Sequence, residues 1–160
     1  MKKTLAFAAA ALAIIITSMH GEEVPKDLIV PKSGLDPDKA VLKELLMKAE
    51  SAGRTYYLVE QTPKEGSRDL VLFSHKAGET PAFVAGGSIT DVLKRAKAPE
   101  IRKQVAEAFV LMERDRVATS NPGKSSEALS RYQSRVKEEA EKGLIPKALK
   151  EAYQSQGTLK

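Results

Sequence analysis

The sequence predicts an α+β fold in which a small antiparallel sheet of two to three strands packs against several helices. Two short runs rich in aromatic and β-branched residues lie close together between residues 55 and 75, as expected of a β-hairpin. Apolar residues recur at helical spacing in the segments on both sides. A length of 160 residues, with 42% hydrophobic and 29% charged residues, is typical of one globular domain.

The chain opens with the pattern of an export signal. Lys2 and Lys3 precede an apolar run that ends before Thr17, an order of charged and apolar segments typical of signal peptides. The run is shorter than the roughly 20 apolar residues of a membrane-spanning helix. Residues 1–21 are therefore predicted to be a signal peptide, with an uncleaved anchor and a buried amino-terminal helix as alternatives. The first two interpretations place the protein outside the cytoplasm, in the periplasm or the secreted fraction.

The segment after the leader differs from the domain that follows it. Residues 22–35 contain Pro25 and Pro31, and proline supplies no backbone donor, so this segment is predicted to be a linker or an edge segment. A single domain is predicted over residues 36–160, beginning with a helix over residues 36–53 that Asp36 would cap. The apolar positions at helical spacing in this segment are Val41, Leu42, Leu45, Leu46 and Ala49.

Strands are predicted next along the chain. Residues 55–59 and 70–73 are aromatic, branched or aliphatic, and the proline and glycine between them favour an antiparallel hairpin. A third short strand is predicted over residues 82–85.

Helices occupy the rest of the predicted domain. Ser88 and Asp91 have the spacing of a capping box at the start of a short helix. Pro99 suits the first turn of a longer core helix, which should end at the turn formed by Asn121, Pro122 and Gly123. Residues 126–142 and 146–154 are predicted to form a carboxy-terminal helical pair.

Two candidate anion sites follow from these elements. Gly86, Gly87 and Ser88 would present open backbone amides at a helix start, although any strand-to-helix turn uses the same residues. The second candidate is a basic face at helical spacing, which could follow a phosphate backbone; its members are Lys124, Arg131, Arg135 and Lys142.

Acidic residues favour a different interpretation of that basic face. Glu127 lies four residues before Arg131, and Glu138 lies four residues before Lys142. Such pairs stabilise an exposed helix, so a solvated, self-compensated surface is the preferred interpretation.

Several kinds of catalytic chemistry are excluded or not favoured by the composition. The absence of cysteine excludes disulfides and thiolate sites. His75 is the one histidine beyond the leader and its processing region, too few for the common zinc sites. Residues 121–126 end like a phosphate-binding loop, but Ala118 stands where that loop needs glycine. Glu60 and Asp69 across the hairpin are a possible carboxylate pair. No metal or cofactor is predicted.

These observations favour a small noncatalytic binding protein of the cell envelope or secreted fraction, with a protein as its partner. The alternatives are a small carboxylate-dependent hydrolase acting on an envelope polymer, and a weak polyanion binder. Without Lys2 and Lys3, the chain has 24 basic and 21 acidic residues. This net charge of +3 does not favour nucleic acid as the partner. Membrane contact is expected only through residues 1–18, if they stay uncleaved.

Overall fold

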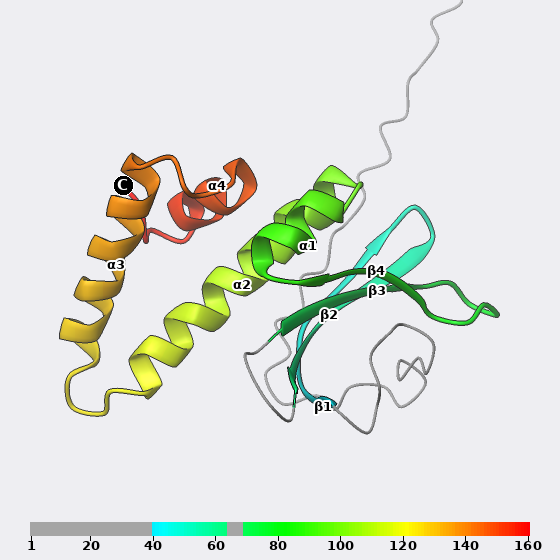
Figure 1. Ribbon diagram of the computed structural model, residues 1–160, viewed down its shortest axis with the longest axis horizontal. Coiled ribbons are helices and arrows are strands. Elements are labelled where there is room, and N and C mark those ends of the chain that lie inside the picture. The colour runs from blue at the N-terminus through cyan, green and yellow to red at the C-terminus, as the bar shows by residue number, and fades with distance from the viewer. Residues whose placement is uncertain (1–39, 64–68) are drawn as a thin grey trace, which may run out of the picture.

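The computed structural model describes residues 40–63 and 69–160, a four-stranded sheet followed by four helices (Figure 1). The strands are β1 (Ala40–Ser51), β2 (Arg54–Pro63), β3 (Asp69–His75) and β4 (Ala82–Gly87). The helices are α1 (Ile89–Arg95), α2 (Pro99–Thr119), α3 (Ser125–Glu141) and α4 (Lys147–Ser155). The predicted leader over residues 1–21 and the predicted linker over residues 22–35 lie outside the described residues.

The sheet is an antiparallel meander in the order β1-β2-β3-β4. The predicted hairpin is confirmed, because β2 and β3 pair from Thr55 with His75 to Gln61 with Asp69. The α+β class is also confirmed. The predicted strand number of two to three was too low, since β1 adds a strand to the three that were expected.

The helix predicted over residues 36–53 is wrong where the structure describes it, because residues 40–51 form β1. Tertiary pairing with β2 overrides the helical propensity of this leucine- and lysine-rich segment. An alternation was visible in its second half, where Met47, Ala49 and Ser51 are buried while Lys48 and Glu50 are exposed. That period of two is the signal of a half-buried strand.

Two irregularities in β1 explain why its first half resembles a helix. The register with β2 shifts between Leu42 and Glu44 and again between Leu45 and Met47. Each shift inserts one extra residue and so changes which face the following side chains occupy. Leu45 and Met47 therefore belong to clusters on opposite faces of the sheet, and the apolar spacing imitates a helical period.

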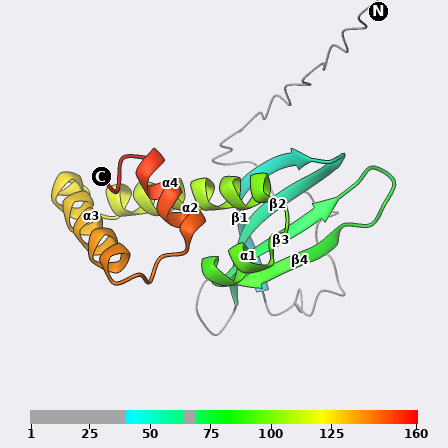
Figure 2. The same cartoon turned by 90° about the horizontal axis from the view of Figure 1, so that it is seen from above.

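The helices form a second and a third layer on one side of the sheet (Figures 1 and 2). The α1 and α2 helices contact the sheet, whereas α3 and α4 pack against α2 at the end away from the sheet. One buried cluster runs through all three layers, from Leu58 and Leu72 in the sheet through Val105 in α2 to Val136 and Leu149. The four predicted helices after residue 87 are thus confirmed, with ends within a few residues of those expected.

The inner strands are apolar on both faces. Leu58, Leu70 and Leu72 face the helices, while a second buried cluster on the opposite face contains no helix residue. Its members are Leu45, Val59, Val71 and Phe73, with Tyr57 packed against them.

The turn between β1 and β2 provides a test of the strand assignment. Ala52 and Gly53 both have positive φ angles, of 49° and 72°, as in the tight hairpin turn that prefers Asn-Gly. Ala52→Asn should therefore raise the free energy of unfolding by about 1 kcal/mol, since asparagine tolerates the left-handed conformation better than alanine. Urea denaturation would measure the change.

The same substitution has the opposite expected sign in a helix. Asparagine is a poorer helix former than alanine by a few tenths of a kcal/mol, so a destabilised Ala52→Asn variant would contradict the hairpin. Gly53→Ala serves as the matched control. It should destabilise, because alanine disfavours the positive φ of this position. The loss would reflect backbone strain and not a clash, since nothing lies within 4 Å of the added Cβ.

Candidate functional site

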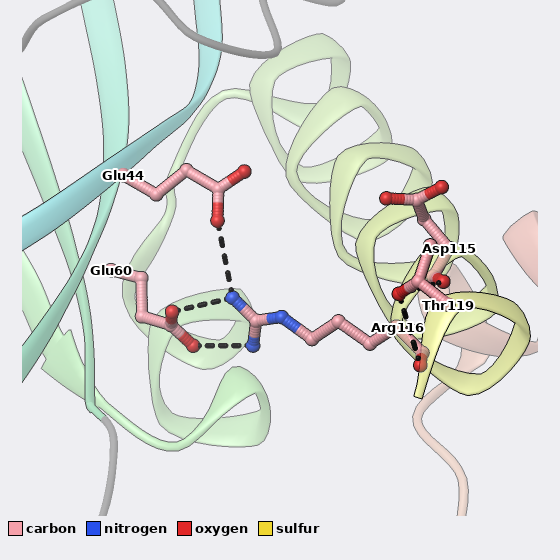
Figure 3. Close-up of polar contacts among 5 residues, drawn as sticks. All are labelled: Glu44, Glu60, Asp115, Arg116 and Thr119. Carbon is pink, nitrogen blue, oxygen red and sulfur yellow. Dashed lines mark hydrogen bonds and ion pairs between the residues drawn. The ribbon is translucent and has the colours of Figure 1, made fainter. Parts of the chain in front are cut away.

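The centre of the inner sheet face carries two glutamates directly opposite one another. Glu44 of β1 pairs with Glu60 of β2 in the sheet register, an arrangement in which like charges destabilise a sheet. Arg116 of α2 lies over both carboxylates (Figure 3). Its two terminal nitrogens donate to Glu60 at 2.7 and 2.5 Å, and one of them also donates to Glu44 at 3.2 Å.

The burial of the three side chains shows why this arginine matters. The Glu60 side chain is only 4% exposed, whereas Glu44 and Arg116 are 35% and 30% exposed. A buried carboxylate needs a partner or it loses its charge. Hydrogen bonding to Glu60 in turn raises the pKa of Arg116 above its ordinary value. The cluster holds α2 against β1 and β2 and retains one net negative charge.

A hollow of about 460 Å³ lies beside this cluster, between α2, the start of α1 and the inner face of β2 and β3. We call it the sheet-side hollow. Its polar lining consists of Glu60, Ser88, Glu113 and Arg116, and its apolar lining includes Leu70, Phe109 and Met112.

Glu113 is the second carboxylate of the sheet-side hollow, and it is also engaged. Its Oε2 atom accepts hydrogen bonds from Tyr132 of α3 at 2.9 Å and Tyr153 of α4 at 2.7 Å. Arg135 lies 3.7 Å from its Oε1 atom and stacks over the Tyr132 ring at 5.5 Å from the ring centre. Both carboxylates of the hollow thus already have hydrogen-bond partners within the protein.

The two tyrosines remain protonated in this environment. Burial raises the pKa of both hydroxyls well above the ordinary range, and the negative charge of Glu113 raises it further. They therefore act as hydrogen-bond donors that connect α3 and α4 to α2. Sequence reasoning missed this cluster, because its members are 19 and 40 residues apart.

The glycine-serine candidate has a structural role in the fold. Ser88 caps α1, and the predicted capping box is confirmed, since the backbone amides of Asp91 and Ser88 each bond to the other's side chain. The Asp91 carboxylate thus already lies at the start of α1, and its hydrogen bonds with Ser88 lower its pKa. Gly86 and Gly87 end β4, and Gly87 needs its positive φ of 115°.

The structure brings the basic residues of α3 together with acidic ones. Arg131 pairs with Glu127 and Lys142 pairs with Glu138, as the spacing indicated. Arg135 is directed to Glu113. Lys124 precedes α3 as its N-cap residue, and its side chain makes no capping hydrogen bond. Whether this face binds an anion stays a prediction.

The suggested carboxylate pair does not converge. Glu60 is opposite Leu70, whereas Asp69 is opposite Gln61. Because adjacent residues of a strand alternate between faces, Glu60 and Asp69 point to opposite sides of the sheet. His75 ends β3 opposite Thr55 and is partly exposed.

The outer edge of β4 is a different kind of surface. No other strand of the described residues pairs with this edge. None of its six residues, AFVAGG, is charged, and Phe83 is 40% exposed while its ring contacts Phe73 edge to face. At the other edge of the sheet, β1 carries Glu44, Lys48 and Glu50.

Comparisons with protein-family models, curated protein sequences and solved structures found no match to this chain. Within residues 40–63 and 69–160, no three histidine, aspartate or glutamate side chains gather as metal ligands. No helix in the same part of the chain has the length and apolar content to cross a membrane.

Removal of the arginine should be costly because it leaves Glu60 buried without its partner. Arg116→Ala should lower the free energy of unfolding by about 3 kcal/mol, the lower end for a broken buried pair, since Arg116 itself is partly exposed. The double variant Arg116→Met with Glu60→Leu should recover most of this loss. Urea denaturation of both variants measures the difference. A single-variant loss under about 1 kcal/mol would match a surface ion pair instead.

The tyrosine cluster predicts a loss of stability in alkaline solution. The unfolded-state pKa is about 10, and the folded-state pKa of Tyr132 and Tyr153 is higher. Their stabilising contribution is complete below pH 10 and declines as the pH rises towards the folded-state values. The free energy of unfolding should therefore fall above about pH 10. In Tyr132→Phe/Tyr153→Phe this slope should be shallower, and an unchanged slope would assign the effect to other groups.

Proposed function

We propose that this protein is a noncatalytic binding protein of the cell envelope or secreted fraction, and that it binds an extended segment of a partner protein along the outer edge of β4. The observation that carries the proposal is that this strand has no charged residue and that no described strand pairs with its outer edge. The predicted leader supports the location. Exposed edges offer a row of backbone donors and acceptors that fits another extended chain.

The composition of β4 supports this use. Edge strands that must avoid pairing usually carry charges, prolines or bulges. The β1 edge follows that rule with four charged residues, Lys43, Glu44, Lys48 and Glu50. The β4 strand shares two of these devices, an extra residue at Val84 in its pairing with β3 and a proline, Pro81, just before it. It has no charged side chain to oppose an added strand.

The size and chemistry of the expected partner segment follow from β4. A strand of six residues is about 20 Å long, so it can pair with a segment of about six residues. Phe83 and Phe73 are cross-strand neighbours on the face away from the helices. A partner side chain opposite Phe83 would extend this pair, which favours an aromatic or β-branched residue there.

Charges placed on the edge should prevent binding without damaging the fold. In a pull-down from the envelope fraction, Ala82→Lys/Phe83→Lys should reduce recovery of the main partner at least tenfold, a loss of about 1.4 kcal/mol or more. The control is Gln133→Lys/Ser134→Lys, which adds the same charge at exposed positions of α3. Circular dichroism would verify that both variants are folded.

A second measurement distinguishes strand addition from other contacts. Hydrogen exchange of the β4 amides should slow in the complex, since pairing protects backbone N–H groups. Equal recovery with the edge and control variants, or unchanged exchange in β4, would refute the proposal.

A further inference from the structure

A second hollow lies between α1, α2 and the start of α4. Its volume is about 450 Å³, and it is open to solvent. Four cationic side chains line it, from three different helices: Lys94, Arg102, Lys103 and Lys147. Glu151 is the one carboxylate in its lining. We call it the basic hollow.

The positive charge of the basic hollow is not neutralised by close ion pairs. Lys147 lies 3.8 Å from Glu151, and Lys103 lies 4.0 Å from Glu107, distances at the limit for an ion pair. The two lysines are 92% and 73% exposed, so solvent screens these pairs strongly. Lys94 interacts electrostatically with Asp91, one turn earlier on α1, without forming a close ion pair among the described residues. The lining therefore carries an excess of three positive charges.

The Arg102 side chain is held in one position at the basic hollow by hydrogen bonds. Its Nε and Nη2 atoms donate to the carbonyl of Ala96 at 3.1 and 3.0 Å, which holds the guanidinium at the end of α1. The Nη1 group makes no hydrogen bond with the described residues. A guanidinium held in this way loses little conformational entropy when it binds a ligand.

The remaining lining suits a ligand larger than a simple ion. Leu93, Pro99, Pro146 and Ala148 supply apolar wall, and the volume exceeds what a single phosphate fills. The first turn of α4, which begins at Lys147 without a side-chain cap, also borders the hollow. Its open amides add to the positive potential, although the four cations carry the inference.

We propose that the basic hollow binds a phosphate ester, with Arg102 and the three lysines around the phosphate and the apolar wall against the group that it carries. Arginine and lysine are the usual phosphate ligands in proteins. The phosphate ester can belong to a lipid headgroup or to a soluble molecule, because both present the same chemistry. This proposal does not depend on strand addition at β4.

The α3 helix provides a matched control for the test. Lys137 and Lys142 are 70% and 60% exposed and pair with Glu141 and Glu138. The variant Lys137→Gln/Lys142→Gln removes the same net charge as Lys94→Gln/Lys147→Gln, but outside the hollow. A difference between the two variants reports the site and not the overall charge.

Calorimetric titration of the full chain with glycerol 3-phosphate measures binding directly. Lys94→Gln/Lys147→Gln should weaken binding at least tenfold, whereas the control should change it less than about twofold. Co-sedimentation with phosphatidylcholine vesicles, with and without phosphatidylglycerol, identifies the source of the phosphate. Binding to anionic vesicles that the hollow variant loses would indicate a lipid headgroup, and binding to glycerol 3-phosphate alone would indicate a soluble ester.

Two results would overturn the proposal. One is equal binding by the hollow and control variants with both probes, which would assign any binding to overall charge. The other is no binding of the wild-type chain to either probe.

Discussion

The alignment of α2 on the sheet is set by a polar cluster inside the shared apolar core, that of Arg116 with the facing glutamates of β1 and β2. Without the arginine, Glu44 and Glu60 would place two carboxylates side by side on the inner sheet face. With it, two hydrogen bonds to Glu60 and one to Glu44 fix the position of α2 over the first two strands (Figure 3). Apolar contacts tolerate sliding, whereas a bidentate pair defines one position. The cluster therefore specifies how the layers align as well as holding them together.

Glu113, three residues before Arg116, connects α2 to the layer formed by α3 and α4. Residues three apart on a helix lie near one another, and both of these side chains line the sheet-side hollow. One connects α2 to the sheet and the other connects α2 to α3 and α4 through Tyr132 and Tyr153. Both charged side chains thus have partners in the neighbouring layers, whereas the Nε2 atom of Gln104, which is buried on the same helix, has no hydrogen-bond partner among the described residues.

Local patterns predicted the local parts of this structure. The hairpin, the Ser88 capping box and the four helices all follow from turn residues and apolar spacing within short windows. The β1 strand was missed because its apolar residues have a helical spacing in the sequence: Leu42, Leu45, Leu46 and Ala49. Two register shifts let this spacing fit a strand, and only long-range pairing decides between the two interpretations. Neither Arg116 nor the four cations of the basic hollow could be assigned from sequence, since segments far apart in the chain bring them together.

Among the described residues, the carboxy-terminal helices α3 and α4 pack mainly against α2. Because they pack on α2 and not on the sheet, a local opening could separate them while the sheet, α1 and α2 stay assembled. Lys147 would leave with α4, and the basic hollow would lose one wall. A ligand held between α4 and the other two helices would oppose that separation, so occupancy and the cohesion of the helical end would be thermodynamically linked.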